Sequence, residues 1–78
     1  MAFETIEEIN LSLAKRFKEL RRKKEISQEQ LSIMSNVSYG TIKRFESKGE
    51  ISLYSLTKLC VALNMEFEIR NLFNKVKI

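Results

Sequence analysis

Two short helices around a three-residue turn are predicted between Ser27 and Glu46, and this pattern constrains the fold more than any other in the chain. Ser27 and Gln30 have the spacing of a capping box, in which a hydroxyl and an amide satisfy free backbone N–H groups. Asn36 tolerates the left-handed conformation that ends a helix sharply, and Ser38 is suited to cap a second helix. The stretch therefore predicts a helix-turn-helix.

Each of these two predicted helices has one apolar face. Leu31 and Met34 give the first helix its inward side. Val37, Ile42 and Phe45 do the same for the second helix and are assigned to the core. The outward stripe of the second helix is small, polar or basic and comprises Tyr39, Gly40, Lys43, Arg44 and Ser47.

A long amphipathic helix from about Ile6 to Lys24 is predicted before this motif, with Thr5 and Glu8 as its capping box. Its apolar residues recur every three or four positions: Ile6, Ile9, Leu13, Phe17 and Leu20. Asn10 and Ser12 leave open a break in this helix. Its last turns are basic, which suits either a solvated helix C-terminus or a surface that faces phosphates. The position directly before the helix-turn-helix favours the phosphate-facing surface.

The segment after the motif predicts two more helices. Gly49 can supply the left-handed residue that ends the second motif helix. Ser52 then caps a helix that ends near Asn64 and whose apolar residues are Leu53, Leu56, Leu59, Cys60 and Leu63. A short fifth helix is expected over Glu66 to Phe73. The alternative is a C-terminal strand exchanged between two chains, because Met65, Phe67 and Ile69 alternate and Val76 and Ile78 would extend the strand.

Composition bounds the class of protein. The 78 residues predict a single domain over 1–78 with a frayed tail at 74–78. One cysteine and no histidine exclude the usual zinc sites, and Cys60 is expected to be a buried structural thiol. No cofactor is predicted, and enzymatic activity is not expected without a histidine base or a glycine-rich phosphate loop.

The acidic N-terminus lacks the layout of a signal peptide, so a cytoplasmic protein is expected. The net charge of +4 permits an anionic partner.

The stretch from Leu20 to Leu63 resembles the Cro/repressor-type helix-turn-helix family, also called the XRE family. The resemblance rests on Leu-Arg before the motif, Ser-Gln-x-x-Leu at its start, Val-Ser before the second helix, Ile-x-x-Phe-Glu at its end and Ser-Leu-x-x-Leu afterwards. It implies an all-α, lambda repressor-like compact bundle of about five helices around a motif at about 27–47. It also implies a homodimer that binds the major groove of double-stranded DNA and regulates transcription. Asn36 and Ser32 depart from the Gly and Ala that are usual at their positions.

The motif residues can be assigned to DNA contacts. Arg44 is expected to read guanine, and Gln28 and Lys43 are expected to contact phosphates. Gly40 is expected either to let the second helix approach base edges closely or to leave a gap that water fills. Tyr39 is either a DNA contact or a packing residue. The predicted DNA-binding residues are Gln28, Ser38, Tyr39, Gly40, Thr41, Lys43, Arg44, Lys48, Arg22 and Lys23.

Glu46 opposes the helix dipole at the end of the second motif helix, so it needs a basic partner. The resemblance implies that Arg21 is this partner, and the alternative is an exposed glutamate.

The sequence as a whole predicts a nucleoid-associated transcriptional regulator, a repressor in preference to an activator. The stretch from Ser38 to Leu53 also resembles regulators paired with kinase-type toxins, so an antitoxin that binds DNA and a toxin remains an alternative. A helical protein-interaction module without DNA binding is the other.

Overall fold

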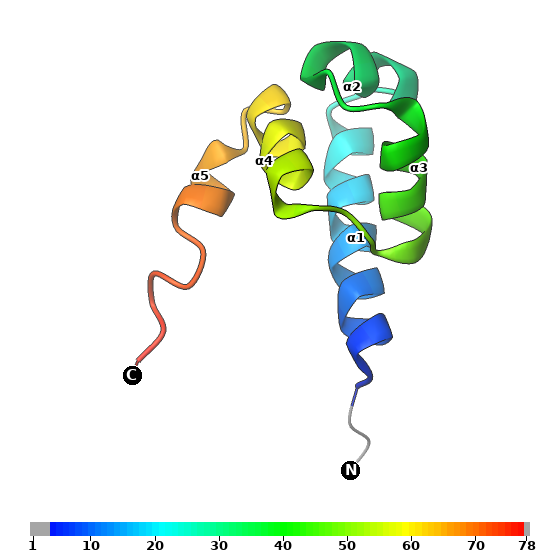
Figure 1. Ribbon diagram of the computed structural model, residues 1–78. Helices are drawn as coiled ribbons and strands as arrows, with labels where there is room; N and C mark the ends of the chain where they lie inside the picture. Colours follow the sequence, from blue (N-terminus) through cyan, green and yellow to red (C-terminus); the bar gives the residue numbers. More distant parts are fainter. Residues whose placement is uncertain (1–3, 78) are drawn as a thin grey trace.

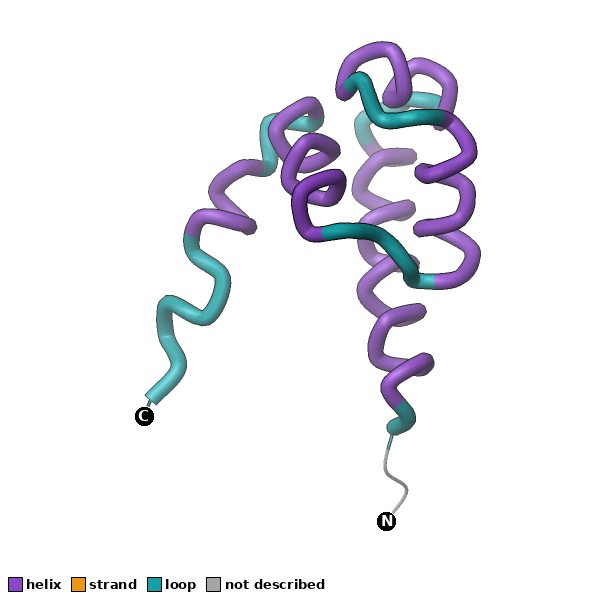
Figure 2. The backbone as a smooth tube through the Cα atoms, viewed as in Figure 1, coloured by secondary structure: helices purple, strands orange, loops and turns teal. Residues whose placement is uncertain are grey.

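The computed structural model describes residues 4–77 and places five helices in them (Figure 1). The helices are α1 (Ile6–Lys23), α2 (Gln28–Ser35), α3 (Tyr39–Lys48), α4 (Leu53–Ala62) and α5 (Glu66–Arg70). This all-helical architecture is the one predicted. The described residues contain no strand, so they do not adopt the alternative of an exchanged C-terminal strand (Figure 2). Ile78, which belonged to that alternative and to the expected frayed tail, lies outside the described residues. Within residues 4–77, no helix combines the length and apolar character that crossing a membrane requires.

The starts of α1 to α4 are fixed by the capping residues that the sequence indicated, whereas α5 begins without a side-chain cap. The Glu8 backbone N–H donates to Thr5 Oγ1 at 3.0 Å, and the Thr5 N–H donates back to Glu8 Oε1 at 2.8 Å. Ser27 and Gln30 repeat this reciprocal pair at the start of α2. The side chains of Ser38 and Ser52 accept from the backbone N–H groups three residues later. Each pair satisfies donors that a helix N-terminus leaves free.

The ends of α2 and α3 follow the predicted local chemistry, and the end of α4 is shifted by one residue. Asn36 and Gly49 adopt left-handed φ angles of 59° and 75°, as predicted. A Cβ on Gly49 would lie 2.9 Å from backbone and side-chain atoms of Asn10, so glycine also permits α3 to end close against α1. At the end of α4, the C-cap is Leu63 and not Asn64, which follows it with a φ of 58°.

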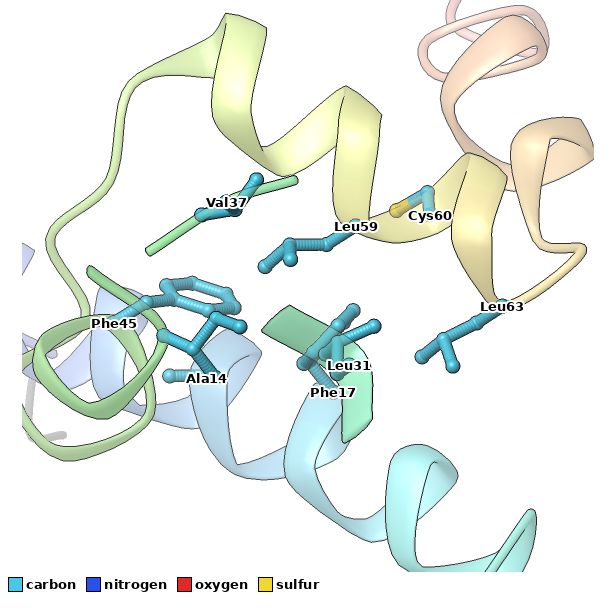
Figure 3. Packing of buried hydrophobic residues seen from close by; sticks show 9 residues of the cluster. Ala14, Phe17, Leu31, Val37, Phe45, Leu59, Cys60 and Leu63 are labelled. Carbon is cyan, nitrogen blue, oxygen red and sulfur yellow. The ribbon is translucent and has the colours of Figure 1, made fainter. Parts of the chain in front are cut away.

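The core lies where α1, α2, α3 and α4 meet (Figure 3). α1 packs on α3, α2 packs on both α3 and α4, and α5 contacts α4. Phe17 and Phe45 join α1 to α3 through an edge-to-face contact with ring centroids 5.3 Å apart. Burial, together with the Glu68 carboxylate, raises the pKa of the Cys60 thiol, as suits a structural cysteine. The buried apolar residues are Ala14, Phe17, Leu31, Val37, Ile42, Phe45, Leu59, Cys60 and Leu63.

The predicted amphipathic helix is confirmed, but its apolar stripe is not the face of α1 that the fold buries. Only Phe17 is buried, and the others are exposed: Ile6, Ile9, Leu13 and Leu20. The buried face of α1 instead carries Ala14 and Arg21. The small Ala14 side chain allows α3 to approach closely on that side. Because α3 ends where Gly49 meets Asn10, Ile6 and Ile9 lie beyond its end, and nothing within residues 4–77 covers them. α1 itself is continuous, without the break considered at Asn10 and Ser12, and ends at Lys23, one residue early.

Three smaller expectations also differ from the structure. Met34 and Leu53 are exposed, because each lies at the rim of its helix pair, outside the core. α5 stops at Arg70 and does not reach Phe73. Phe73 has a φ of 66° and lies in a turn that leaves its ring exposed.

Candidate nucleic-acid interface

The outward face of α3 is open to solvent along its whole length. The exposed residues are the predicted stripe of Tyr39, Gly40, Lys43, Arg44 and Ser47. At the start of the helix, Ser38 Oγ accepts from the Thr41 N–H at 3.1 Å and donates to Thr41 Oγ1 at 2.7 Å. Both hydroxyl groups therefore hold the first turn of α3, and Thr41 is half-buried. This end of the helix presents a fixed backbone to any ligand that approaches it.

Tyr39 and Lys43 are paired on this face. The Lys43 Nζ lies 5.2 Å from the centroid of the Tyr39 ring, within the range of a cation–π contact. Tyr39 thus packs against Lys43 and remains exposed, so both of its predicted roles stay open.

Gly40 leaves open space on the same face. A Cβ built at this position would meet no atom of another element within 4 Å among the described residues. Gly40 also has no positive φ, so neither packing nor backbone geometry requires a glycine here. Because Gly40 has no side chain, the backbone of α3 is more accessible between Tyr39 and Arg44.

Arg44 is not a free side chain. Its Nε and Nη2 atoms donate to a single oxygen of Glu50, Oε1, at 2.9 and 2.6 Å. The two side chains are 67% and 58% exposed, so the ion pair lies on the surface. Glu50 is not among the predicted DNA-binding residues. Its only signal was an acidic residue just past the end of a basic helix.

A buried network fixes α3 against α1 and α2. Arg21 Nε donates to Glu46 Oε2 at 2.7 Å and Arg21 Nη2 donates to Glu46 Oε1 at 2.8 Å, which forms the bidentate pair that the family resemblance implied. The Arg21 and Glu46 side chains are 7% and 2% exposed. Arg21 Nη1 also donates to the Ile26 carbonyl at 2.7 Å. The pair therefore joins the last turn of α1 to the last turn of α3.

Gln28 belongs to this network, a role that the sequence analysis missed. Its amide nitrogen donates to Glu46 Oε1 at 2.9 Å. A glutamine amide carries two N–H groups, so this bond leaves a second N–H for another acceptor. Gln28 therefore lies between the buried pair and the surface, half-buried at the first position of α2.

The basic end of α1 meets the N-terminus of α2 at a shallow depression of about 370 Å³. Backbone N–H groups at a helix N-terminus and basic side chains together attract anions. The depression is lined by Lys18, Arg21, Arg22, Ser27 and Gln28. Lys23 is exposed beside Arg22. Lys48 is not part of this group, because it ends α3 at the far end of the bundle (Figure 1).

Comparison with known proteins places this geometry in a family. The helix-turn-helix family model HTH_3 matches residues 17–69, which span α2 to α4, the last turns of α1 and most of α5. Neither the curated proteins nor the solved structures gave a significant match. The matched segment contains both helices of the motif, the Arg21–Glu46 pair and the exposed face of α3. The chain therefore belongs to the XRE family of Cro/C1-type helix-turn-helix proteins, which are DNA-binding regulators.

Proposed function

We propose that this protein is a sequence-specific transcriptional repressor that binds operator DNA as a homodimer in the cytoplasm. The observation that carries the proposal is the exposed polar and basic face of α3, held at a fixed angle by the buried Arg21–Glu46 pair. A helix presented in this way fits the major groove of B-DNA. A repressor needs only to occupy its site, so a domain of this size is sufficient.

In this proposal the outward face of α3 reads bases, and the polar and basic residues around it contact phosphates. The first turn of α3, with Ser38, Tyr39 and Gly40, lies against base edges, and Arg44 reads guanine O6 and N7. Thr41 and Lys43 flank these contacts. The phosphate contacts come from Gln28, Arg22, Lys23, Lys43 and Lys48. The depression at the start of α2 supports this assignment, because it gathers basic side chains and helix N–H groups around Gln28.

The uncovered apolar surface of α1 supports a homodimer. Leu13 and Leu20 form one wall of a groove of about 440 Å³ whose other wall comes from α4 and α5, including Leu56 and Ile69. Ile6 and Ile9 continue the exposed stripe of α1 past the end of α3. In a two-fold dimer the same surface is used twice, so apolar residues that one chain leaves open cover each other.

An antitoxin role is the second candidate, and a separate surface favours it. A depression of about 530 Å³ between α2 and α4 is lined by the exposed apolar side chains of Met34, Leu53, Tyr54 and Val61. Exposed apolar surface of this kind is typical of protein-binding sites. A toxin bound here would leave the outward face of α3 free for DNA.

The test separates base reading from phosphate binding. Fluorescence anisotropy would measure the binding of a duplex selected from a random library and of a scrambled duplex, at one salt concentration. Arg44→Ala should cost about 1 to 3 kcal/mol on the selected duplex and flatten the preference at one base pair per half-site. Lys43→Ala should weaken binding to both duplexes by a similar factor, because phosphates carry no sequence information.

A salt titration provides the control. The logarithm of the affinity should fall linearly with the logarithm of the salt concentration, with a slope of about −0.9 per phosphate contact. Association with protein but with no duplex at any salt concentration would instead identify a helical interaction module. Equal losses on both duplexes for Arg44→Ala would move base reading to Tyr39 or Ser38.

A further inference from the structure

We infer that Glu50 is a positioning residue that determines how selectively Arg44 binds DNA. It holds the Arg44 guanidinium in the orientation that reads a guanine and weakens the attraction of Arg44 to phosphates. This inference rests on the proposed function, because it concerns the same face of α3. It adds a residue outside the helix to the set that determines specificity.

The geometry of the pair leaves the reading edge of Arg44 free. Nε and Nη2 form the side edge of the guanidinium plane, and both donate to Glu50 Oε1. The end edge, made of one N–H on Nη1 and the second N–H on Nη2 pointing in parallel, is not used by this contact. A bidentate contact with guanine O6 and N7 needs two such parallel donors. Glu50 therefore occupies the edge that base reading does not need.

The backbone that carries Glu50 is fixed. Glu50 directly follows Gly49, whose left-handed φ of 75° turns the chain away from α3. Gly49 lies so close to Asn10 of α1 that a Cβ would be only 2.9 Å from it, which leaves this turn little freedom. The Glu50 backbone is thus held at a set place relative to α3, and from there its carboxylate accepts both hydrogen bonds from Arg44 and limits the conformations of that long side chain.

Stability does not explain this ion pair. Exposed ion pairs contribute little to folding because water and salt screen them, and both partners here are more than half exposed. A carboxylate on a DNA-facing surface also repels phosphates. This repulsion is useful for discrimination, because specificity is the difference between the affinities for the correct and the incorrect DNA site. A carboxylate beside Arg44 lowers the affinity for the incorrect site. A guanine recovers the lost affinity by engaging the free edge, whereas a phosphate must compete with Glu50.

The experiment compares variants at Glu50 on the selected and scrambled duplexes, at one salt concentration. Glu50→Ala should raise the affinity for the scrambled duplex and lower the ratio of selected to scrambled affinity by about fivefold or more. Glu50→Gln retains an oxygen that can accept from Arg44, so it should raise scrambled binding but keep more of the ratio. In an Arg44→Ala background, Glu50→Ala should leave the ratio unchanged, because the residue that it positions is absent.

The control is Glu66→Ala, which removes an equal charge from the exposed start of α5. It should raise both affinities by one common factor and leave the ratio unchanged. If Glu50→Ala behaves like this control, or lowers the ratio equally without Arg44, the inference is wrong while the proposed function stands. If the parent protein does not distinguish the two duplexes, the proposed function fails and this inference fails with it. Circular dichroism melts should show that the Glu50 variants are folded.

Discussion

Replacing Arg21 by methionine should destabilise the protein severely, because it leaves a buried charge without its partner. The Glu46 side chain is 2% exposed and accepts two of its hydrogen bonds from Arg21. Only the neutral Gln28 amide, at 2.9 Å, would remain. Removing one partner of a buried ion pair costs about 3 to 5 kcal/mol. A domain of 78 residues has a total stability of only about 4 to 12 kcal/mol, so this loss is a large fraction of it.

The measurement is urea unfolding followed by circular dichroism, with thermal melts beside it. A loss of about 3 kcal/mol should lower the melting temperature by at least about 12 °C in a domain of this size. The double variant Arg21→Met with Glu46→Leu should recover most of the stability, because well-packed apolar residues can replace a buried ion pair at little cost. The matched control is Arg44→Met, which breaks an exposed pair of the same chemistry and should cost less than about 1 kcal/mol.

Two results would refute this reasoning. An unfolding free energy for Arg21→Met within about 1 kcal/mol of the parent, with an unchanged urea dependence, would mean that water reaches Glu46. A double variant as unstable as the single one would attribute the loss to the packing of the Arg21 stem and not to the orphaned carboxylate.

Two further predictions follow from the backbone and the first helix cap. Gly49→Ala should cost about 1 to 3 kcal/mol in a urea melt, because alanine would be strained at a φ of 75° and its Cβ would meet Asn10, whereas Gly40→Ala should leave stability equal or higher. Hydrogen bonds from the backbone N–H and then the hydroxyl of Thr5 hold the pKa of Glu8 below its ordinary value. The cap therefore stabilises α1 above the pKa of the unfolded carboxyl and loses that effect as the pH falls through the lower folded pKa. An NMR titration of the Glu8 carboxyl should show the depressed pKa. Thr5→Ala removes the hydroxyl but keeps the backbone N–H, so it should raise this pKa only part of the way; an unchanged titration in that variant would contradict the contribution of the hydroxyl.

Helix starts and turns could be predicted from the sequence because their chemistry is local. Ser27 and Gln30 are three residues apart, so the hydrogen bonds between them depend on nothing else in the fold. The left-handed positions of Asn36 and Gly49 likewise depend on the residue itself and its neighbours. These features fixed the order of the helices and placed the motif correctly.

Contacts across the fold were predictable only where a pattern implied them. The Arg21–Glu46 pair joins residues 25 positions apart, and only the family resemblance related them. The Arg44–Glu50 pair depends on how two long exposed side chains meet beyond the end of α3, which the predicted helix stop at Gly49 does not specify. The place of Gln28 in the buried network was missed for the same reason, because it depends on how close α2 lies to Glu46.

The error in α1 shows what hydrophobic periodicity does and does not specify. The spacing of Ile6, Ile9, Leu13 and Leu20 correctly indicated one apolar side of a continuous helix, but not what would cover it. Within the chain, α3 packs against the neighbouring side that carries Ala14, because a small residue there lets two helices approach closely. Leu13 and Leu20 remain exposed at the groove with α4 and α5, and Ile6 and Ile9 are exposed outside it. The outward face of α3 is a separate exposed surface. Leaving an apolar stripe of this length in water costs free energy. We therefore expect a second copy of the chain to cover the stripe while α3 lies in the major groove of DNA.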